Sequence, residues 1–285
     1  MTGELTVVRA GALTTVQDTG RRGRAHLGVP RSGALDAPAM GLANRLLGNA
    51  PDAAVLETTL TGCALRADRA TTVVVGGAPC PVTVDGRPAA WGAPVRVPAG
   101  AVLDAGGVSA GVRSYVAVAG GIAVDPVLGS RSTDLLSGLG PALLRDGDVL
   151  PLGDPVRRTV PADTAPWPAP PATLTLPLRP GPRADWFTPA ALRTLTSATY
   201  RVSQHSNRIG LRTEGPPLER ASEGELPSEG MVLGAVQVPP DGRPVVFLHD
   251  HPTTGGYPVI GVVPEAALAG AAQAAAGTPL RFTLG

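Results

Sequence analysis

Glycine and proline punctuate this sequence so often that no long helix or strand can form in most of it. The 285 residues include 37 glycines and 31 prolines, which separate short runs rich in β-branched residues, such as 71–75 and 113–119. The run 82–84 meets Asp85–Gly86, a pair that favours a type I′ hairpin turn. Hydrophobic residues make up 43% of the chain, so we reject low-complexity disorder as the explanation. The sequence therefore predicts a mainly β protein with a few helices.

Three segments carry helix signals. Asp36 can cap a helix whose first turn contains Pro38 and whose natural end is Gly48. A second helix is expected to begin at Thr188–Pro189, and an alanine-rich third helix to run from residue 264 toward 277. All three are short, which agrees with a β-dominated fold.

A proline-rich stretch divides the chain. Residues 156–172 hold so many prolines that they cannot join a sheet ladder or a helix interior, and they predict an extended linker. Because 285 residues exceed the usual size of one domain, we expect an N-terminal subdomain over 1–155 and a C-terminal one over 173–285. The alternative is one large β domain.

Charge and lysine content narrow the function classes. Lys plus Arg total 24 against 23 for Asp plus Glu, so no electrostatic footprint for nucleic acid or an anionic membrane is expected. Every basic residue is arginine, which excludes a Schiff-base lysine, a phosphate-loop lysine and a biotinyl-lysine. With no signal-peptide pattern and no apolar window of membrane-spanning length, we expect a cytoplasmic protein.

Metal binding is disfavoured by the spacing of the candidate ligands. His249 and His251 would share one face of a strand, but no third ligand is identifiable and Pro252 indicates that the strand ends there. Cys63 and Cys80 match no metal-ligand spacing, although a single disulfide between them is an open alternative. We predict solvated or hydrogen-bonded histidines rather than a metal site.

A serine hydrolase is also disfavoured. Ser32 and Ser228 lie in glycine-flanked turns, but neither stands in a Gly-x-Ser-x-Gly elbow, and the strand-to-helix context of that elbow is missing. A Ser–Lys arrangement is excluded by the absence of lysine.

Polar, glycine-bearing loops interrupt the β runs. They concentrate amide, carboxylate, guanidinium and hydroxyl groups, and loops on a rigid β scaffold often carry binding residues. These segments are 14–23, 26–36, 203–212, 227–242 and 249–258. Taken singly, each can also be explained as turn chemistry.

An ordered series of motifs in and between these loops resembles one known family over nearly the whole chain. The motifs are 13–18, 27–36, 43–49, 114–122, 128–133, 179–183, 206–210, 228–230, 237–242 and 253–258. The resemblance is to the allophanate hydrolase subunit 2 family, also called biotin-dependent carboxyltransferase-like, which includes the 5-oxoprolinase C subunit and the regulator KipA. It implies two cyclophilin-like β-barrel subdomains.

The resemblance implies three alternative functions. A stand-alone chain of this size is most similar to the C subunit of an ATP-dependent 5-oxoprolinase, which with a subunit-B-like (KipI-type) and a subunit-A-like protein opens 5-oxoproline to glutamate and is not active alone. ATP would then bind with or on the partners. The alternatives are a KipA-like, non-catalytic regulator, and a carboxyltransferase acting on urea or another small amide. The latter would need a biotin carboxylase in trans, because this chain can carry no covalent biotin.

From the resemblance follows a hypothesis for a small-amide site in the cleft between the subdomains. Arg21, Arg208 and Arg212 would hold a carboxylate or a phosphorylated intermediate. Amide-orienting and other substrate-binding roles would fall to Gln17, Ser32, Asn207, Gln237, Thr254 and Tyr257. Asp18 and Glu229 would transfer protons. The alternative for the arginines is salt bridges within the loops, and Arg208→Ala is expected to abolish activity without unfolding the chain.

Overall fold

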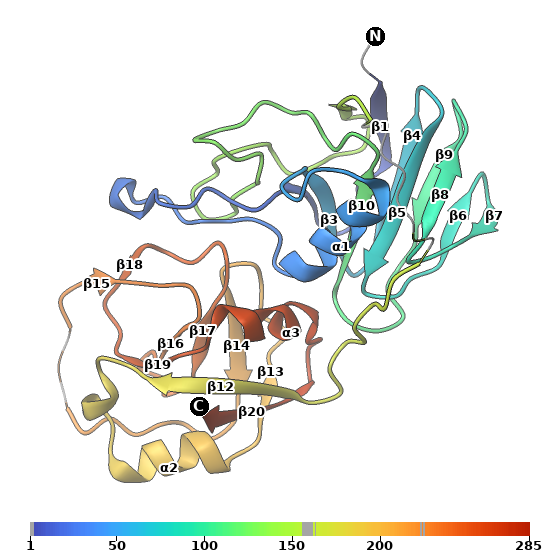
Figure 1. Cartoon of the computed structure of the whole chain (residues 1–285). Helices are drawn as coiled ribbons and strands as arrows, with labels where there is room; N and C mark the ends of the chain where they lie inside the picture. The colour runs from blue at the N-terminus through green and yellow to red at the C-terminus, as the bar shows by residue number, and fades with distance from the viewer. Residues whose placement is uncertain (1–2, 156–161, 163, 223, 225) are drawn as a thin grey trace. The chain divides into compact units, whose positions relative to one another are not determined.

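The computed structural model describes residues 3–155, 162, 164–222, 224 and 226–285, and within them the chain is mainly β (Figure 1). Two compact units emerge from the contacts. The first comprises 1–21, 32–134 and 138–170, and the second comprises 22–31, 135–137 and 171–285. The predicted fold class is confirmed: short strands dominate, and the described residues hold three α-helices.

Two antiparallel sheets build the first unit. Their strands are β1 (Glu4–Arg9), β2 (Thr14–Gln17), β3 (Val55–Thr59), β4 (Cys63–Ala67), β5 (Thr71–Gly77), β6 (Val82–Val84), β7 (Arg87–Ala89), β8 (Pro94–Val97), β9 (Val102–Ala105), β10 (Arg113–Val118) and β11 (Val149–Pro151). The orders are β11-β1-β4-β9-β6-β7 and β2-β3-β10-β5-β8. Side chains such as Val7, Leu65, Val75 and Val116 meet in one core between them. The β6–β7 hairpin turns at Asp85–Gly86, both at positive φ, as a type I′ turn requires.

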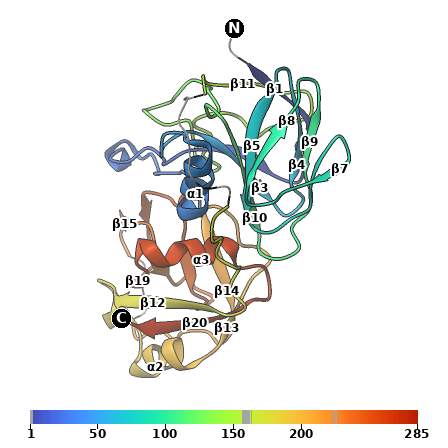
Figure 2. The ribbon, with the colours of Figure 1, turned by 45° about the vertical axis from the view of Figure 1, so that its right-hand side comes forward.

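Helix α1 (Ala37–Leu47) begins and ends where the sequence predicts. Asp36 accepts a hydrogen bond from the backbone N–H of Ala39 at 3.0 Å, and Gly48 closes the helix at φ 69°. Its apolar side, including Met40 and Ala43, packs on β5 and β10 (Figure 2).

A buried polar contact holds the entry of α1 against the sheet. The Tyr115 hydroxyl donates to Glu57 Oε2 at 2.9 Å and accepts from the backbone N–H of Asp36 at 2.8 Å. Burial, and the neighbouring Glu57 carboxylate, raise the pKa of Tyr115 well above its usual value, so this hydroxyl stays a donor at neutral pH.

The second unit is a closed barrel of order β12-β19-β16-β17-β14-β13-β20. Its strands are β12 (Leu174–Pro180), β13 (Tyr200–Val202), β14 (Gly210–Glu214), β16 (Ala235–Gln237), β17 (Val245–Phe247), β19 (Val259–Val262) and β20 (Pro279–Leu284). The parallel β12–β20 pair closes the ring, and the other pairs are antiparallel. Outside the barrel, β15 (Glu229–Gly230) pairs with β18 (Thr254–Gly255).

Two helices accompany the barrel. Helix α2 (Pro189–Ser197) begins as predicted, because Thr188 caps it by accepting from the backbone N–H of Ala191 at 3.1 Å. The predicted third helix is shorter than expected: a 3-10 turn, η3 (Glu265–Ala267), leads into α3 (Leu268–Gln273). It stops before 277 because Ala274 is already extended and the chain must turn back into β20. Two further 3-10 turns are η1 (Ala25–Leu27) and η2 (Ala184–Trp186).

Residues 156–161 and 163 of the proline-rich stretch lie outside the described part of the chain. Its later residues up to Pro170 belong to the first unit, and the last two belong to the second. The Trp167 indole N–H donates to the carbonyl of Gly92 at 2.8 Å, and its ring lies 5.7 Å from that of Trp91. The predicted domain limits at 155 and 173 stay a prediction.

Candidate functional site

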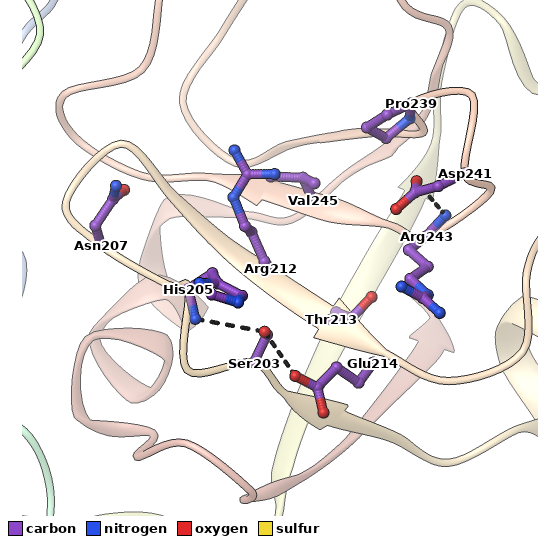
Figure 3. A pocket seen from close by; sticks show the side chains of 10 residues that line it. All are labelled: Ser203, His205, Asn207, Arg212, Thr213, Glu214, Pro239, Asp241, Arg243 and Val245. Carbon is purple, nitrogen blue, oxygen red and sulfur yellow. Dashed lines mark hydrogen bonds between the residues drawn. The ribbon is translucent and has the colours of Figure 1, made fainter.

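A pocket of about 760 Å³ lies on the barrel unit (Figure 3). Its size falls in the range of small-molecule sites, about 300–1,000 Å³. Ten residues line it: Ser203, His205, Asn207, Arg212, Thr213, Glu214, Pro239, Asp241, Arg243 and Val245. Asn207 and Arg212 are among the residues predicted from the sequence, and most of the others are polar or charged.

Strand β14 supplies one wall of this pocket. Alternation along the strand buries Leu211 and Thr213 and exposes Arg212 and Glu214, so the two charged side chains share the outer face. The Thr213 hydroxyl donates to the carbonyl of Pro244 at 2.8 Å, which ties the strand to the chain entering β17. The pocket wall is therefore rigid backbone with two charged groups on it.

The loop between β13 and β14 supplies hydrogen-bonding groups. The Ser203 hydroxyl donates to Glu214 Oε1 at 2.7 Å and accepts from the backbone N–H of His205 at 3.4 Å. Asn207 Oδ1 accepts from the backbone N–H groups of Ile209 at 2.9 Å and Gly210 at 3.2 Å. Its amide oxygen is thus occupied, and its NH₂ group is the part left for a ligand.

The first unit gathers three of the predicted residues around the segment 127–133. Asp18 is 6% exposed, and its carboxylate accepts from Ser130 Oγ at 2.6 Å, Ser132 Oγ at 2.7 Å, and the backbone N–H groups of Arg131 at 2.6 Å and Gly20 at 2.8 Å. Four donors on one buried carboxylate form a structural clamp. Proton transfer by Asp18 stays a prediction, and it would require one of these bonds to open.

Arg21 and Gln17 reach the same segment. Arg21 Nε donates to the carbonyl of Val127 at 3.3 Å, and Arg21 Nη2 donates to the carbonyl of Ser132. Gln17 Nε2 donates to the carbonyl of Thr133 at 3.0 Å. Arg21 is therefore engaged with backbone carbonyls of its own unit.

Two of the predicted residues in this unit keep buried polar atoms without a partner. Within the described residues, Gln17 Oε1 and Ser32 Oγ are fully buried and have no hydrogen-bond partner. Buried polar groups are rarely left unpaired, so these two atoms retain hydrogen-bonding capacity for a water or a ligand group. Ser32 also has a positive φ of 53°, and the next residue, Gly33, lies close to the backbone of Asp18.

Arg208 does not face an open site. It forms a two-bonded ion pair with Asp250, and both side chains are buried. The backbone N–H of Leu135 adds a third donor to Asp250 Oδ2 at 3.2 Å. The alternative of a salt bridge within the loops therefore describes Arg208. From the sequence we expected Arg208→Ala to leave folding intact; from the buried ion pair we expect it to destabilise the protein.

The remaining predicted residues meet around the β15–β18 ladder. Glu229 pairs with Arg183, whose hydrogen bonds hold the pKa of that carboxyl below its usual range. Gln237 Nε2 donates to the carbonyl of Tyr257 at 3.1 Å, and Thr254 lies opposite Gly230. Glu229 is thus ionised at neutral pH, so it would serve as a base or an anchor rather than an acid.

His251 is packed and hydrogen-bonded within the barrel unit. His251 stacks on Phe247 with ring centroids 5.8 Å apart, and its Nδ1 lies 2.8 Å from the carbonyl oxygen of Pro252. In the described part of the chain no group of three or more His, Cys, Asp or Glu could hold a metal ion. No helix among these residues is both long enough and apolar enough to cross a membrane.

The sequence did not single out several side chains that the structure places in these sites. Ser130 and Ser132 lie in a motif that carried the family resemblance, and Glu214 stands two residues after Arg212, so their signals were present. Arg243 had no such signal, because it follows the segment 227–242, whose polar residues can be explained as turn chemistry.

Comparison with known proteins gives concordant matches. The chain is 39% identical to the 5-oxoprolinase C subunit of Escherichia coli K12, over 98% of this chain and 90% of that protein. It is 35% identical to urea amidolyase of Lachancea kluyveri, over 97% of this chain but 16% of that protein. The crystal structure of TTHA0988 superposes with a TM-score of 0.89 at 38% identity, covering 99% of this chain and 56% of that one. This chain thus spans just over half of TTHA0988. Residues 27–284 match the family described as "Carboxyltransferase domain, subdomain A and B", and the chain belongs to that family.

Proposed function

We propose that this chain is the C subunit of an ATP-dependent 5-oxoprolinase, which opens 5-oxoproline to glutamate together with a subunit-B-like and a subunit-A-like protein. The observation that carries the proposal is the likeness to a 5-oxoprolinase C subunit over 98% of this chain and 90% of the relative. Agreement over nearly the full length of both proteins supports the same subunit role, and a cytoplasmic location is part of the same proposal.

ATP binding falls to the partner subunits in this proposal. The chain has no lysine, so it lacks the residue that a phosphate-binding loop uses to reach the terminal phosphates. For the same reason no biotin can be attached to it.

The groups of this chain with unused hydrogen-bonding capacity differ from those that already have partners. Gln17 Oε1 and Ser32 Oγ are buried acceptors, and Ser32 is also a donor, so both suit a small amide such as a lactam. Arg212 and Asn207 line the barrel pocket and suit a carboxylate. Arg208 and Arg21 are held by their own units, which favours a supporting role for them.

The test is reconstitution. The chain is co-expressed with its subunit-B-like and subunit-A-like partners, and glutamate formed from 5-oxoproline is measured with and without ATP. Glutamate that requires ATP, and that disappears when this chain is omitted, is the expected result. A stable three-protein complex that forms no glutamate would overturn the proposal.

A carboxyltransferase is the second candidate, and the likeness to urea amidolyase favours it. It would accept a carboxyl group from carboxybiotin on a separate carrier and pass it to urea or another small amide. Transfer of labelled carboxylate from a biotinylated carrier to urea, dependent on this chain, would support this candidate. A complex with the subunit-B-like protein that shows neither activity would leave the KipA-like regulatory role, which stays a prediction.

A further inference from the structure

Beside Arg212, the barrel pocket contains three charged groups that the small-amide hypothesis does not use. Arg212 and Glu214 project from β14, whereas Asp241 and Arg243 come from the turn before β17 (Figure 3). Two positive and two negative side chains therefore line one pocket. Their formal charges cancel, so the pocket does not simply attract anions.

The two arginines of the pocket have the most unused hydrogen-bond donors. Within the described residues, neither the Arg212 nor the Arg243 guanidinium has a hydrogen bond or an ion pair, and the hydrogen bonds of both residues are made by their backbone. Each guanidinium offers five N–H donors in a planar fork that matches a carboxylate. Two unpaired forks in one pocket fit a ligand with two carboxylate groups.

The carboxylates of Glu214 and Asp241 each accept a hydrogen bond at one of their two oxygens. Glu214 Oε1 accepts from Ser203 at 2.7 Å, and Asp241 Oδ1 accepts from the backbone N–H of Arg243 at 3.1 Å. These bonds fix the two side chains and leave one oxygen of each for a donor. An ammonium group is the donor that would also balance their charge. A ligand with carboxylates alone would bring like charges together at Glu214 and Asp241.

We propose that this pocket binds an acidic α-amino acid, with its carboxylates on Arg212 and Arg243 and its ammonium group on Glu214. The Asn207 NH₂ group, which also lines the pocket, adds a donor for a carboxylate oxygen. This inference deepens the proposed function and rests on it only in the choice of probe, L-glutamate, which is the expected product.

Binding is measured by isothermal titration calorimetry on the full chain alone, without ATP or partners. L-Glutamate is compared with glutarate, which lacks the ammonium group, and with 4-aminobutyrate, which lacks the α-carboxylate. We expect L-glutamate to bind at least about tenfold more tightly than either analogue, as for a lost charge-assisted hydrogen bond. Glutarate that binds as tightly as L-glutamate would overturn the amino-acid assignment.

Three variants test the residues, each an exposed side chain whose change should leave the fold intact. Arg212→Gln, Arg243→Gln and Glu214→Gln should each weaken L-glutamate binding about tenfold. Arg193→Gln, at an exposed position on α2, is the matched control and should bind like the unmodified chain. Unchanged affinity in both arginine variants, or no binding by the unmodified chain, would overturn the proposal.

The reconstituted complex separates this inference from the proposed function. If the complex forms glutamate but the chain binds none, the pocket assignment fails and the oxoprolinase role stands. If the chain binds L-glutamate through Arg243 but the complex forms none, the pocket assignment stands and the oxoprolinase role fails.

Discussion

Arg208 and Asp250 meet in a buried, two-bonded ion pair: Nε lies 2.9 Å from Oδ2, and Nη2 lies 3.0 Å from Oδ1. Arg208 is 1% exposed and Asp250 is inaccessible. Removing one partner leaves the other charge buried and unpaired, so Arg208→Ala should lower the free energy of unfolding by about 3–5 kcal/mol. Urea denaturation of the purified chain measures this change.

A matched series separates the lost pair from the lost side chain. Arg193→Ala, exposed on α2, should change the free energy of unfolding by less than about 0.5 kcal/mol. A double variant, Arg208→Leu with Asp250→Leu, should lose less than the sum of the two single changes, because neither charge is then stranded. Additive losses, or an Arg208→Ala variant as stable as the unmodified chain, would contradict this interpretation.

Asp18 should matter first for stability. Its carboxylate accepts four hydrogen bonds, three at Oδ1 and one at Oδ2. Asp18→Asn removes the charge that strengthens these bonds and replaces one oxygen with an NH₂ group that faces a donor instead of accepting from it. We expect a loss of at least about 2 kcal/mol, in the range for charge-assisted hydrogen bonds. Asp125→Asn, at an exposed position, is the control. A stable Asp18→Asn chain that supports no turnover in the complex would instead support the proton-transfer role.

A Ser32 variant should distinguish an effect on substrate binding from an effect on stability. The buried Ser32 hydroxyl has no partner within the described residues, so Ser32→Ala should change the free energy of unfolding by less than about 0.5 kcal/mol. If the hydroxyl binds the substrate amide, kcat/KM of the complex should fall about tenfold. Ser130→Ala is the contrasting variant, since its hydroxyl is bonded to Asp18 and its loss should lower stability. Unchanged kcat/KM in Ser32→Ala would remove Ser32 from the site.

Local signals predicted much of the fold. The cap at Asp36, the stop at Gly48 and the turn at Asp85–Gly86 each depend on a few neighbouring residues, and all three appear as expected. The helix predicted toward 277 ended early because the return into β20 is set by tertiary structure, which no local pattern encodes.

The site was harder to predict because its contacts join distant residues. Arg208 was predicted to bind substrate, yet its partner Asp250 lies 42 positions away, and no local pattern indicates that pairing. Asp18 similarly meets Ser132 across 114 positions. Residue type indicated which side chains could bind a ligand, and the fold decided which of them are already occupied.

Glu229 should show the pH dependence of a paired carboxylate. The hydrogen bonds from Arg183 lower its pKa in the folded chain below the value of about 4.3 for an unfolded glutamate. The pair therefore stabilises the folded chain above that pH, and the contribution is lost as the pH falls through the folded-state pKa. In Arg183→Ala, NMR titration should find the Glu229 pKa raised, whereas Arg193→Ala should leave it unchanged. A Glu229 pKa that does not move in Arg183→Ala would contradict the assignment.

Cys63 and Cys80 should resist alkylation while the chain is folded. Both are free thiols, 1% and 7% exposed, and burial raises the pKa of Cys63 to about 12 and raises that of Cys80. Because the thiolate is the reactive form, iodoacetamide at pH 8 should modify neither residue in the native protein and both in urea, as read by mass spectrometry. Ser197→Cys, exposed at the end of α2, is the positive control and should react in the native protein. Native Cys63 that reacts as fast as this control would mean that the core of the first unit opens readily, because only local unfolding could bring the thiol to water.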